Sequence, residues 1–423
     1  MPIKIFIKTY GCSHNVSDSE VMAGLLKQAD FQITEREDDA NLILINSCTV
    51  KNKSQNHFFK YLEEVKKQRK PVVVAGCIPQ TMPDKLSGLP MVGTKQVSQV
   101  VSVVEEALND NPITALAMEP HIRLNLPKIR SNPIVEIIPI QDGCLSACTF
   151  CLTKKARGSL RSFMPEDIVK QAKTAVQEGV KEIWLSSEDN GCYGFDIKTN
   201  LAKLVKEIVK IPGDFKVRVG MGNPQHFMKY LEELVEILKH EKVYKFIHIP
   251  VQSGSNKVLK EMKRGYTVEE FKELVAKLRK AIPEITIATD VIVAFPGETH
   301  DEFLETVQLL KDVKPPIVNI SRYSDRPGTA AAQREDQISG DESKQRSSFV
   351  TQTFEYVAYE QNKKWQNWEG EVVVTQEGKD HSWVGRNYCY KPVILHGKFT
   401  LGDKVKVKVM YSTIYDLRAD IMD

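Results

Sequence analysis

Six of the eight cysteines in this 423-residue chain fall into two sets of three, and these sets restrict the possible folds more than any other feature. The tight trio lies in the segment GCLSACTFC and consists of Cys144, Cys148 and Cys151. The dispersed trio consists of Cys12, Cys48 and Cys77. Closed zinc sites and ordinary iron–sulfur clusters use four protein ligands, so three thiolates leave one metal position open to a small molecule. The sequence therefore predicts two metal centres, each with an open position.

Composition indicates the cellular compartment in which we expect this chain. Eight cysteines in so long a chain are typical of thiolate ligands in a reducing compartment rather than of a disulfide framework. No run of eighteen apolar residues and no signal-peptide pattern occurs, so we expect a cytoplasmic protein without a membrane segment. The net charge of +3 permits a nucleic-acid partner but does not argue for one.

Residues 1–108 alternate short apolar segments with helical patterns. The segments IKIFIKTY, LILINSC and PVVVAGC each lead into one cysteine of the dispersed trio. Such alternation is typical of a parallel sheet, whose strands end at one edge, where doubly wound folds bind ligands. The sequence therefore predicts an N-terminal doubly wound α/β domain in which the dispersed trio can converge. Taken alone, three separate buried cysteines without a metal are the alternative.

The rest of the chain divides into a linker and two further domains. Residues 109–132 lack periodicity and contain several prolines, which predicts a linker. In residues 133–363, six apolar strands with helical crossovers predict a partial (β/α)6 barrel with its site at the strand C-terminal ends. Within this range we expect an exposed charged segment over 333–348 and a helix after it. Residues 364–423 contain four short strand patterns with Gly and Asp turns, which predict a small β-barrel.

The tight trio directly follows the strand pattern IVEIIPI. Its spacing of four and three residues places three sulfurs on one loop, which can hold three corners of a four-iron cluster. A zinc loop lacking its fourth ligand, or a set of structural thiols, is the alternative. The motif resembles that of the radical S-adenosylmethionine (SAM) enzymes. This resemblance implies a catalytic centre in which the open iron binds SAM and cleaves it to a 5′-deoxyadenosyl radical.

The resemblance also implies which side chains bind SAM. Phe150 matches an aromatic residue that lies beside the adenine in this family, and Ser187 and Glu188 follow a strand where the family keeps polar groups for the SAM ammonium. Gln252 and Ser253 end a later strand and are expected to face the same site. For Ser187 and Glu188, a solvated turn or a helix cap is an equally good interpretation.

Longer stretches resemble the methylthiotransferases over nearly the whole chain. The stretches are TYGCSHNVSDSE, NSCTVKNKS, VAGCIPQ, GCLSACTFCLTKKARGSLRS, HIPVQSGSNKVLKEMKRGYT, TDVIVAFPGET and SRYSDRPGTAA. In this family the dispersed trio holds a second four-iron cluster, whose open iron carries the sulfur to be inserted. The resemblance implies two [4Fe-4S] clusters, SAM as methyl donor and radical source, and a C-terminal barrel of the TRAM type that binds RNA.

The segments WLSSEDNGCYGFD and RVGMGNP look most like the archaeal and eukaryotic branch. That branch acts on N6-threonylcarbamoyladenosine at position 37, in the anticodon loop of tRNA, and requires an electron donor and a sulfur donor. Two positions depart from the family pattern: Ala294 replaces a usual Gly, and Cys192 replaces a common Ala. We expect Ala294 to alter packing more than chemistry, and Cys192, like Cys389, to be a buried inert thiol.

Charge in residues 364–423 is nearly balanced, so RNA affinity there must come from local arrangement. The segment WVGRNYCYK interleaves aromatic rings with cations, which suits stacking and phosphate binding to an unpaired RNA loop. The residues predicted to bind RNA are Arg386, Asn387, Tyr388 and Lys391. A barrel core with a solvated hairpin is the alternative. Linker cations Arg123, Lys128 and Arg130 are expected on solvated faces, with phosphate contacts as the second interpretation.

Two rival functions follow from the same residues. A non-catalytic iron–sulfur or zinc protein that binds RNA would explain the cysteines and the barrel without SAM chemistry. A methylthiotransferase acting on a ribosomal protein side chain would keep the chemistry and change the acceptor. The sequence does not identify the tRNA isoacceptors, either donor or the oligomeric state.

Overall fold

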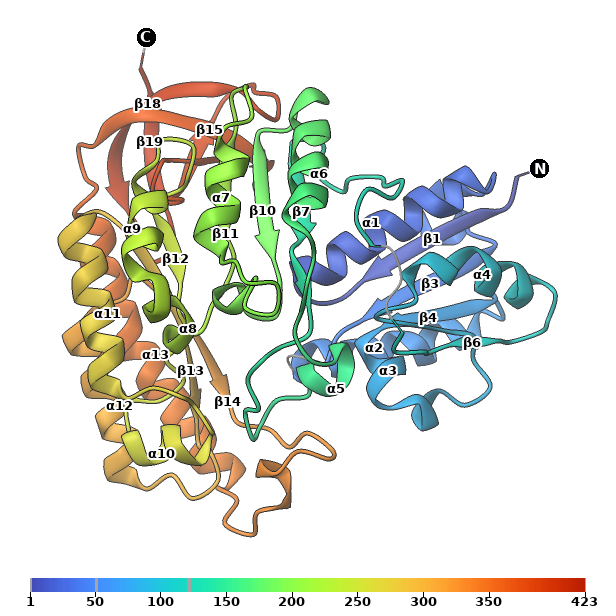
Figure 1. Cartoon of the computed structure of the whole chain (residues 1–423), viewed down its shortest axis with the longest axis horizontal. Coiled ribbons are helices and arrows are strands. Elements are labelled where there is room, and N and C mark those ends of the chain that lie inside the picture. Colours follow the sequence, from blue (N-terminus) through green and yellow to red (C-terminus); the bar gives the residue numbers. More distant parts are fainter. Residues whose placement is uncertain (1, 50–51, 120–122, 423) are drawn as a thin grey trace.

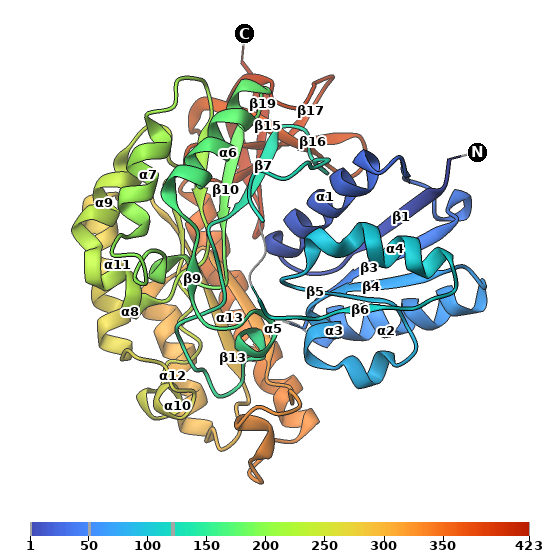
Figure 2. The same cartoon turned by 45° about the vertical axis from the view of Figure 1, so that its right-hand side comes forward.

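Short apolar strands alternating with helices pair in parallel along the first three quarters of the chain, and the remainder closes on itself as a small barrel (Figure 1). The computed structural model describes residues 2–49, 52–119 and 123–422. Figure 2 shows the N-terminal sheet beside the central sheet, with the C-terminal barrel at one end of the central strands. The three-part α/β architecture predicted from the sequence is confirmed.

The N-terminal sheet is parallel throughout and has the order β2-β1-β3-β4-β5-β6. Its strands are β1 (Lys4–Thr9), β2 (Gln32–Thr34), β3 (Leu42–Ser47), β4 (Val72–Gly76), β5 (Met91–Gly93) and β6 (Thr114–Ala115). Its helices are α1 (Ser13–Gln28), α2 (Asn52–Lys67), α3 (Cys77–Thr81) and α4 (Val100–Leu108). Separate apolar clusters lie under α1 with α4 and under α2, so helices cover both faces of a doubly wound sheet.

Six parallel strands form the central sheet. They are β7 (Val135–Pro139), β10 (Glu182–Ser186), β11 (Lys216–Val219), β12 (Phe246–His248), β13 (Thr286–Val293) and β14 (Ile317–Arg322). Three pair in the order β11-β10-β7 and three in the order β12-β13-β14. Backbone hydrogen bonds from Val217 to Lys242 and from Tyr244 to Val217 join the two halves. The result is an open barrel of six strands, as the sequence predicted.

Helices cover the outside of this open barrel and bury its largest apolar cluster. The long ones are α6 (Pro165–Gln177), α7 (Leu201–Val209), α9 (Leu231–Lys239), α11 (Val268–Ala281), α12 (His300–Val313) and α13 (Gly340–Lys363). Short elements are β8 (Gln141–Asp142), α5 (Thr153–Arg157), β9 (Arg161–Ser162), α8 (Pro224–Phe227) and α10 (Asn256–Glu261). Within the described ranges, no helix has the length and apolar character needed to cross a bilayer.

Helix α13 begins nine residues earlier than the sequence predicted. Ser339 caps its first turn by accepting a hydrogen bond from the Glu342 backbone, so the helix starts inside the charged segment 333–348. The sequence pattern did not reveal this helix start, because the charged residues lie mainly on the solvent side of the helix. Arg346 is the exception: it turns inward and binds Glu298 at 2.7 Å. The last part of the expected exposed segment is therefore helical.

The C-terminal barrel is closed by five strands in the order β15-β16-β17-β19-β18. They are β15 (Glu369–Glu377), β16 (Ser382–Arg386), β17 (Pro392–His396), β18 (Lys404–Ser412) and β19 (Leu417–Ile421). Four of them match the predicted strands. The fifth, β19, was missed because LRADI is short and polar, yet it pairs with both β17 and β18 and thereby closes the barrel.

The barrel packs on the N-terminal ends of the central strands. Its contacts there are with residues that directly precede those strands: Asn132 donates to the Thr375 carbonyl at 2.8 Å, and Lys404 binds Asp214 at 2.8 Å. Tyr390 inserts its ring against Tyr244 and Phe246 with ring centroids 4.8 and 5.1 Å away. The barrel therefore lies at the end of the central strands opposite to their C-terminal ends.

The buried hydrogen bonds of Asn387 in the C-terminal barrel predict a specific effect on stability. Asn387 is 1% exposed, and its Oδ1 accepts hydrogen bonds from the backbone N–H groups of Cys389 and Lys391 at 3.0 and 2.9 Å. Asn387→Ala should lower the free energy of unfolding by about 1–3 kcal/mol, because two buried donors lose their acceptor. Denaturant unfolding followed by tryptophan fluorescence measures the loss. His396→Ala, an exposed change in the same barrel, is the control, and equal losses in both variants would contradict the structural role.

Candidate functional site

The dispersed trio converges at the C-terminal edge of the N-terminal sheet. Cys12 follows β1 and precedes α1, Cys48 follows β3, and Cys77 opens α3 directly after β4. Strands β1, β3 and β4 are neighbours in the sheet. The strand order reverses between β1 and β3, which is the point where doubly wound folds bind ligands. The structure thus brings together three cysteines that are far apart in the sequence.

A close backbone approach holds this loop cluster. A Cβ atom on Gly11 would lie 2.7 Å from Cys48 Cβ and 3.1 Å from Cys48 Sγ, and Gly11 has φ of +126°. Only glycine tolerates both conditions. Burial raises the pKa of Cys77 to about 12, and it raises that of Cys12 to about 11 although Cys12 keeps an exposed surface. The nearby charge of Arg157 opposes both shifts and favours the thiolates.

The tight trio lies on the loop between β8 and α5. A backbone hydrogen bond from Cys151 to Cys148 forms the turn, and the Thr153 backbone N–H donates to Cys151 Sγ at 3.3 Å. Arg264 Nη1 donates to Cys148 Sγ at 3.2 Å. Burial raises the pKa of Cys144 to about 12. N–H donors aimed at sulfur stabilise thiolates, which are the metal-binding form of cysteine.

The two trios lie close to each other across the contact between the N-terminal and central domains. Helix α3, which begins at Cys77, packs against α5, which follows Cys151. Thr94 Oγ1 donates to the Ala156 carbonyl at 2.6 Å and ties α5 to the N-terminal sheet. Burial lowers the pKa of Arg326, and the thiolates of Cys48 and Cys151 both oppose that shift. One guanidinium is therefore within electrostatic range of both trios.

The donor set of each trio distinguishes between metal types. Four ligands around one zinc ion at 2.3 Å lie about 3.8 Å apart. Among the residues that the structure describes, neither trio brings its three sulfurs within 4.8 Å of one another. The donor set is three thiols in each case, which suits three corners of a four-iron cluster, whereas a closed zinc site uses four protein ligands.

One further group of metal-binding residue types is Asp189, Cys192 and His226, all buried. The Asp189 carboxylate accepts hydrogen bonds from Gly191, from His226 Nδ1 at 2.7 Å, and from both the backbone and the side chain of Asn223. These four donors occupy its lone pairs, so the group is a hydrogen-bonded support behind Cys144. Cys192 is fully buried, as expected for an inert thiol, and so is Cys389.

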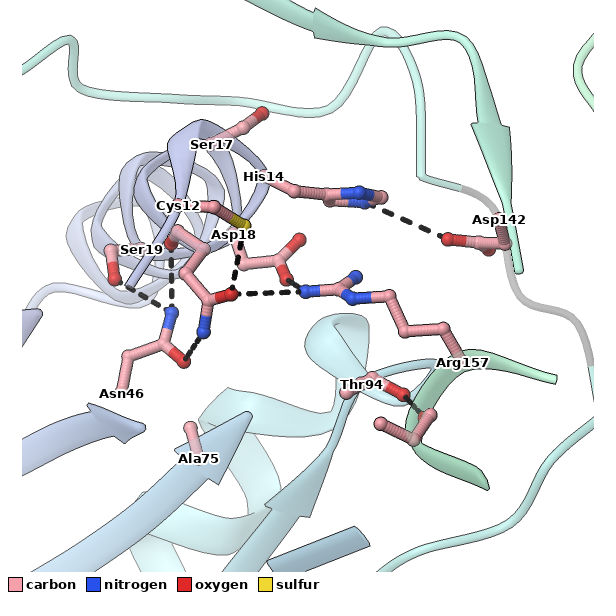
Figure 3. A network of polar contacts seen from close by, with 12 residues as sticks. Cys12, His14, Ser17, Asp18, Ser19, Asn46, Ala75, Thr94, Asp142 and Arg157 are labelled. Atoms are coloured by element: carbon pink, nitrogen blue, oxygen red, sulfur yellow. Dashed lines mark hydrogen bonds and ion pairs between the residues drawn. The ribbon is translucent and has the colours of Figure 1, made fainter. Parts of the chain in front are cut away.

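Six buried side chains form an ion network between the two α/β domains, part of which Figure 3 shows. Each is at most 7% exposed, and the set consists of His14, Asp18, Arg123, Asp142, Arg157 and Glu188. Arg157, on α5, binds Asp18 of α1 at 2.9 Å and Glu188 after β10 at 3.1 Å. Arg123 binds Asp18 as well and lies 3.6 Å from Asp142.

His14 completes this network as a neutral group. Its Nδ1 lies 3.0 Å from Glu188 Oε1, and its Nε2 lies 3.7 Å from Asp142 Oδ1. Burial lowers the pKa of His14 well below its usual value, and the charges of Arg157 and Arg123 add to this. The sequence had given none of Arg157, His14 and Asp18 a role. The only signal was that all three lie inside motif stretches that contain the cysteines.

The side chains predicted to bind SAM differ in their surroundings. Phe150 packs beside Met262 and Phe295 near the strand C-terminal ends. Ser187 Oγ accepts from the Asp189 backbone at 3.1 Å, which is the turn-capping role left open by the sequence. Glu188 Oε1 lies 3.0 Å from His14 Nδ1 and 3.1 Å from Arg157 Nε, whereas its buried Oε2 has no hydrogen-bond partner within the described ranges.

Gln252 and Ser253 follow β12 at the same end of the barrel. Ser253 Oγ lies 3.3 Å from Thr306 Oγ1 and accepts from the Ser255 backbone at 3.2 Å, which stabilises the turn. Gln252 has φ of +72°, and its buried Oε1 has no hydrogen-bond partner within the described ranges. Gln252 Oε1, like Glu188 Oε2, is therefore suited to accept a hydrogen bond from a bound ligand.

Two of the four residues predicted to bind RNA, Asn387 and Lys391, are buried, and the other two, Arg386 and Tyr388, are half-buried. Asn387 and Lys391 are 1% and 4% exposed, and Lys391 Nζ donates to Asn362 at 2.7 Å. Arg386 lies over the Tyr390 ring at 4.5 Å, and Tyr388 packs against two tryptophans of the barrel. The aromatic and cationic residues of WVGRNYCYK therefore pack where the barrel meets the central domain.

The linker cations are paired with carboxylates rather than solvated. Lys128, which is half-buried, lies 2.8 Å from Glu136, a fully buried carboxylate on β7, and half-buried Arg130 binds the same group. Arg123 is buried and belongs to the ion network described above. Residues 120–122 of the predicted linker lie outside the described ranges, and Thr114–Ala115 of that linker form β6 of the N-terminal sheet.

Comparison with protein families finds three matches along the chain. Residues 4–94 match the uncharacterized protein family UPF0004, residues 138–310 match the radical SAM superfamily, and residues 368–422 match the TRAM domain. These ranges coincide with the N-terminal sheet, the open barrel and the C-terminal barrel.

Curated relatives match nearly the whole chain. The human threonylcarbamoyladenosine tRNA methylthiotransferase is 45% identical over 403 residues, which covers 93% of this chain and 69% of the human protein. The probable threonylcarbamoyladenosine tRNA methylthiotransferase of Pyrococcus abyssi is 43% identical over 400 residues, which covers 93% of each chain.

Solved structures share the fold at low sequence identity. The radical SAM methyltransferase TsrM from Kitasatospora setae, with tryptophan and a SAM analogue bound, has a TM-score of 0.57 at 14% identity over 78% of this chain and 75% of that one. The cobalamin-dependent SAM radical enzyme OxsB has a TM-score of 0.51 over 83% of this chain and 56% of that one.

The backbone conformation of Ala294, directly after β13, predicts a measurable strain. Ala294 has φ of +59°, a left-handed conformation that favours glycine, and its backbone donates to Glu298 at 2.8 Å. Ala294→Gly should raise the free energy of unfolding by about 1 kcal/mol, because the Cβ clash disappears. Ala276→Gly, on the exposed side of α11, is the matched control and should lower it by a similar amount. Thermal unfolding measures both, and a loss at Ala294 would contradict the strain.

Proposed function

This chain belongs to the threonylcarbamoyladenosine tRNA methylthiotransferases, and from that premise we propose that it converts N6-threonylcarbamoyladenosine at position 37 of tRNA to its 2-methylthio derivative. The observation that carries the proposal is the placement of two cysteine trios side by side on different domains. One trio follows a strand of a radical SAM barrel, and the other lies at the switch point of a doubly wound sheet. Relatives that match 93% of this chain are named as threonylcarbamoyladenosine tRNA methylthiotransferases.

The cofactors of the family are SAM and two [4Fe-4S] clusters. In our proposal Cys144, Cys148 and Cys151 hold the cluster that binds SAM, and the dispersed trio holds the other. When bound, these groups supply the radical and the sulfur that an aromatic C–H requires, because no side-chain base near pH 7 can remove such a proton. The donor chemistry reported above, three thiols in each trio, supports both assignments.

The chain's own residues prepare the SAM side of the site. Arg264 donates to Cys148 Sγ from one guanidinium nitrogen, while its other nitrogens contact the Pro250 carbonyl and Tyr266 Oη. This cation offsets thiolate charge and fixes the cysteine loop against the strand ends. We propose that Phe150 and Gln252 contact SAM, Phe150 through its ring and Gln252 through its unpartnered Oε1. We assign Ser187 and Ser253 to supporting roles because their hydroxyl groups already accept turn hydrogen bonds. We propose that Glu188 also contacts SAM, through its unpartnered Oε2.

A second surface of the C-terminal barrel is more exposed than the predicted hairpin. Tyr411 and Tyr415, at the β18–β19 turn, are 56% and 64% exposed. Asn362 of α13 donates to the Thr413 and Ile414 carbonyls at 3.0 Å, so the turn is held in place. Exposed aromatic rings on a fixed turn are a stacking platform for unpaired bases. We propose that this turn contacts tRNA.

The reaction also needs partners outside the chain. An electron donor must reduce the clusters, and a sulfur donor must replace the sulfur that leaves with each product. We propose that the protein works in the cytoplasm, where tRNA and a reducing environment for six thiolates are both present.

Exchanging one cysteine in each trio should separate the two halves of the reaction. Cys48→Ser should keep SAM cleavage to 5′-deoxyadenosine but abolish methylthiolation, whereas Cys148→Ala should lose both, because one lost thiolate leaves too few ligands for its cluster. Chromatography of 5′-deoxyadenosine and nucleoside mass spectrometry of the tRNA measure the two outcomes. Cys389→Ala, in the barrel, is the control and should retain both. Sulfur insertion by Cys48→Ser at the parent rate would refute the assignment of the dispersed trio.

A second prediction concerns tRNA binding. Replacing Tyr411 and Tyr415 together with alanine should weaken tRNA binding at least about 5-fold, because stacking contributes about 1–3 kcal/mol per base. Folding should be unaffected, since both rings are exposed. Titration of the anticodon stem-loop at fixed salt measures the affinity, with the exposed change His381→Ala as control. Unchanged affinity would show that the RNA contacts lie elsewhere.

A further inference from the structure

Arg157 extends from the radical SAM domain toward the dispersed trio. It ends α5, the helix that follows Cys151, and it is 2% exposed. Its Nη2 donates to Asp18 at 2.9 Å (Figure 3) and to Asn15 at 3.4 Å. Its Nε lies 3.1 Å from Glu188 Oε1. Two of its three nitrogens are therefore fixed by groups from two different domains.

The third nitrogen of this guanidinium is unsatisfied. Arg157 Nη1 is buried and has no hydrogen-bond partner within the part of the chain that the structure describes. Leaving a buried donor unpaired costs about 1–3 kcal/mol, and more for a charged group. Buried guanidinium nitrogens are normally hydrogen-bonded, so this one calls for an acceptor that the described residues do not supply.

The surroundings of Arg157 indicate where that acceptor lies. Asn15 Oδ1 contacts both Arg157 Nη2 at 3.4 Å and Cys12 Sγ at 3.5 Å, so one atom bridges the guanidinium and the trio. The positive charge of Arg157 acts on both Cys12 and Cys77, favouring their thiolates. The guanidinium therefore lies directly beside the dispersed trio, although it is attached to the other cysteine-bearing domain.

We propose that Arg157 Nη1 donates a hydrogen bond to a sulfur atom of the cluster held by the dispersed trio, and that Arg157 is a positioning residue that sets the reduction potential of this cluster. The inference rests on the proposed function, because it requires a cluster at the dispersed trio. A cation and an N–H donor next to cluster sulfur stabilise the more negative, reduced state and so raise the potential. The N-terminal cluster site is then complete only with a side chain from the radical SAM domain.

An arginine suits this position better than a lysine does. Its planar fork presents donors in fixed directions, so one side chain can bind Asp18, Glu188 and a sulfur atom simultaneously. A lysine ammonium would retain the charge, but it would not hold three acceptors in that geometry. The substitution Arg157→Lys therefore separates the effect of charge from the effect of the directed hydrogen bond.

The test uses the full chain with Cys144, Cys148 and Cys151 replaced by alanine, so that only the N-terminal cluster gives a signal. A redox titration followed by electron paramagnetic resonance (EPR) measures its midpoint potential. Arg157→Gln should shift the potential to a more negative value, Arg157→Lys should shift it less, and Lys155→Gln, an exposed cation on the same helix, should leave it unchanged. In protein labelled with ¹⁵N-arginine, pulsed EPR should detect a ¹⁵N coupling that both Arg157 variants lose.

A second pair of variants controls for misfolding of Arg157→Gln. Arg157→Gln leaves Glu188 facing only neutral His14, whereas Asp18 keeps Arg123. The double variant Arg157→Gln with Glu188→Gln removes that unpaired carboxylate and is compared with Glu188→Gln alone. An unchanged potential together with a retained ¹⁵N coupling would overturn the inference and leave the proposed function intact. A parent protein that binds no iron would instead overturn the proposed N-terminal cluster, and the inference with it.

Discussion

The buried ion pairs between α1 and the central domain fix how the two α/β domains meet, and the position of one cysteine trio relative to the other depends on that contact. Asp18 of α1 receives both Arg123 and Arg157, so the helix that follows Cys12 is tied to the linker and to the helix that follows Cys151. Glu188 binds the other side of Arg157. A rotation of either domain would separate charges that are no more than 7% exposed.

Such a network acts on orientation more than on stability. Bringing charges out of water costs several kcal/mol per ion, and their attraction returns about as much only in good geometry. Removing one partner is far more costly, because it leaves a buried charge uncompensated. Two α/β domains held by apolar contact alone could slide, whereas directed hydrogen bonds from two guanidinium groups define one arrangement. Two reactive centres on separate domains require that kind of constraint.

The sequence predicted those features that depend on local pattern. Strands that end in cysteine predicted the convergence of Cys12, Cys48 and Cys77, because parallel strands end at a common edge. It failed where the partner of a side chain lies far away in the chain. Arg123 and Lys128 look like solvated linker cations until their carboxylates on α1 and β7 are in place. Lys391, with its neighbouring rings, resembles an RNA-binding hairpin, yet it faces α13.

The most direct test of this account is the magnetic interaction between the two clusters. In chemically reduced protein, each paramagnetic cluster should broaden and split the EPR spectrum of the other, because the two trios face each other across one interface. The spectrum of the parent should therefore differ from the sum of the spectra of variants that lack one trio or the other. A parent spectrum equal to that sum would show that the clusters do not interact, and would contradict the arrangement described here.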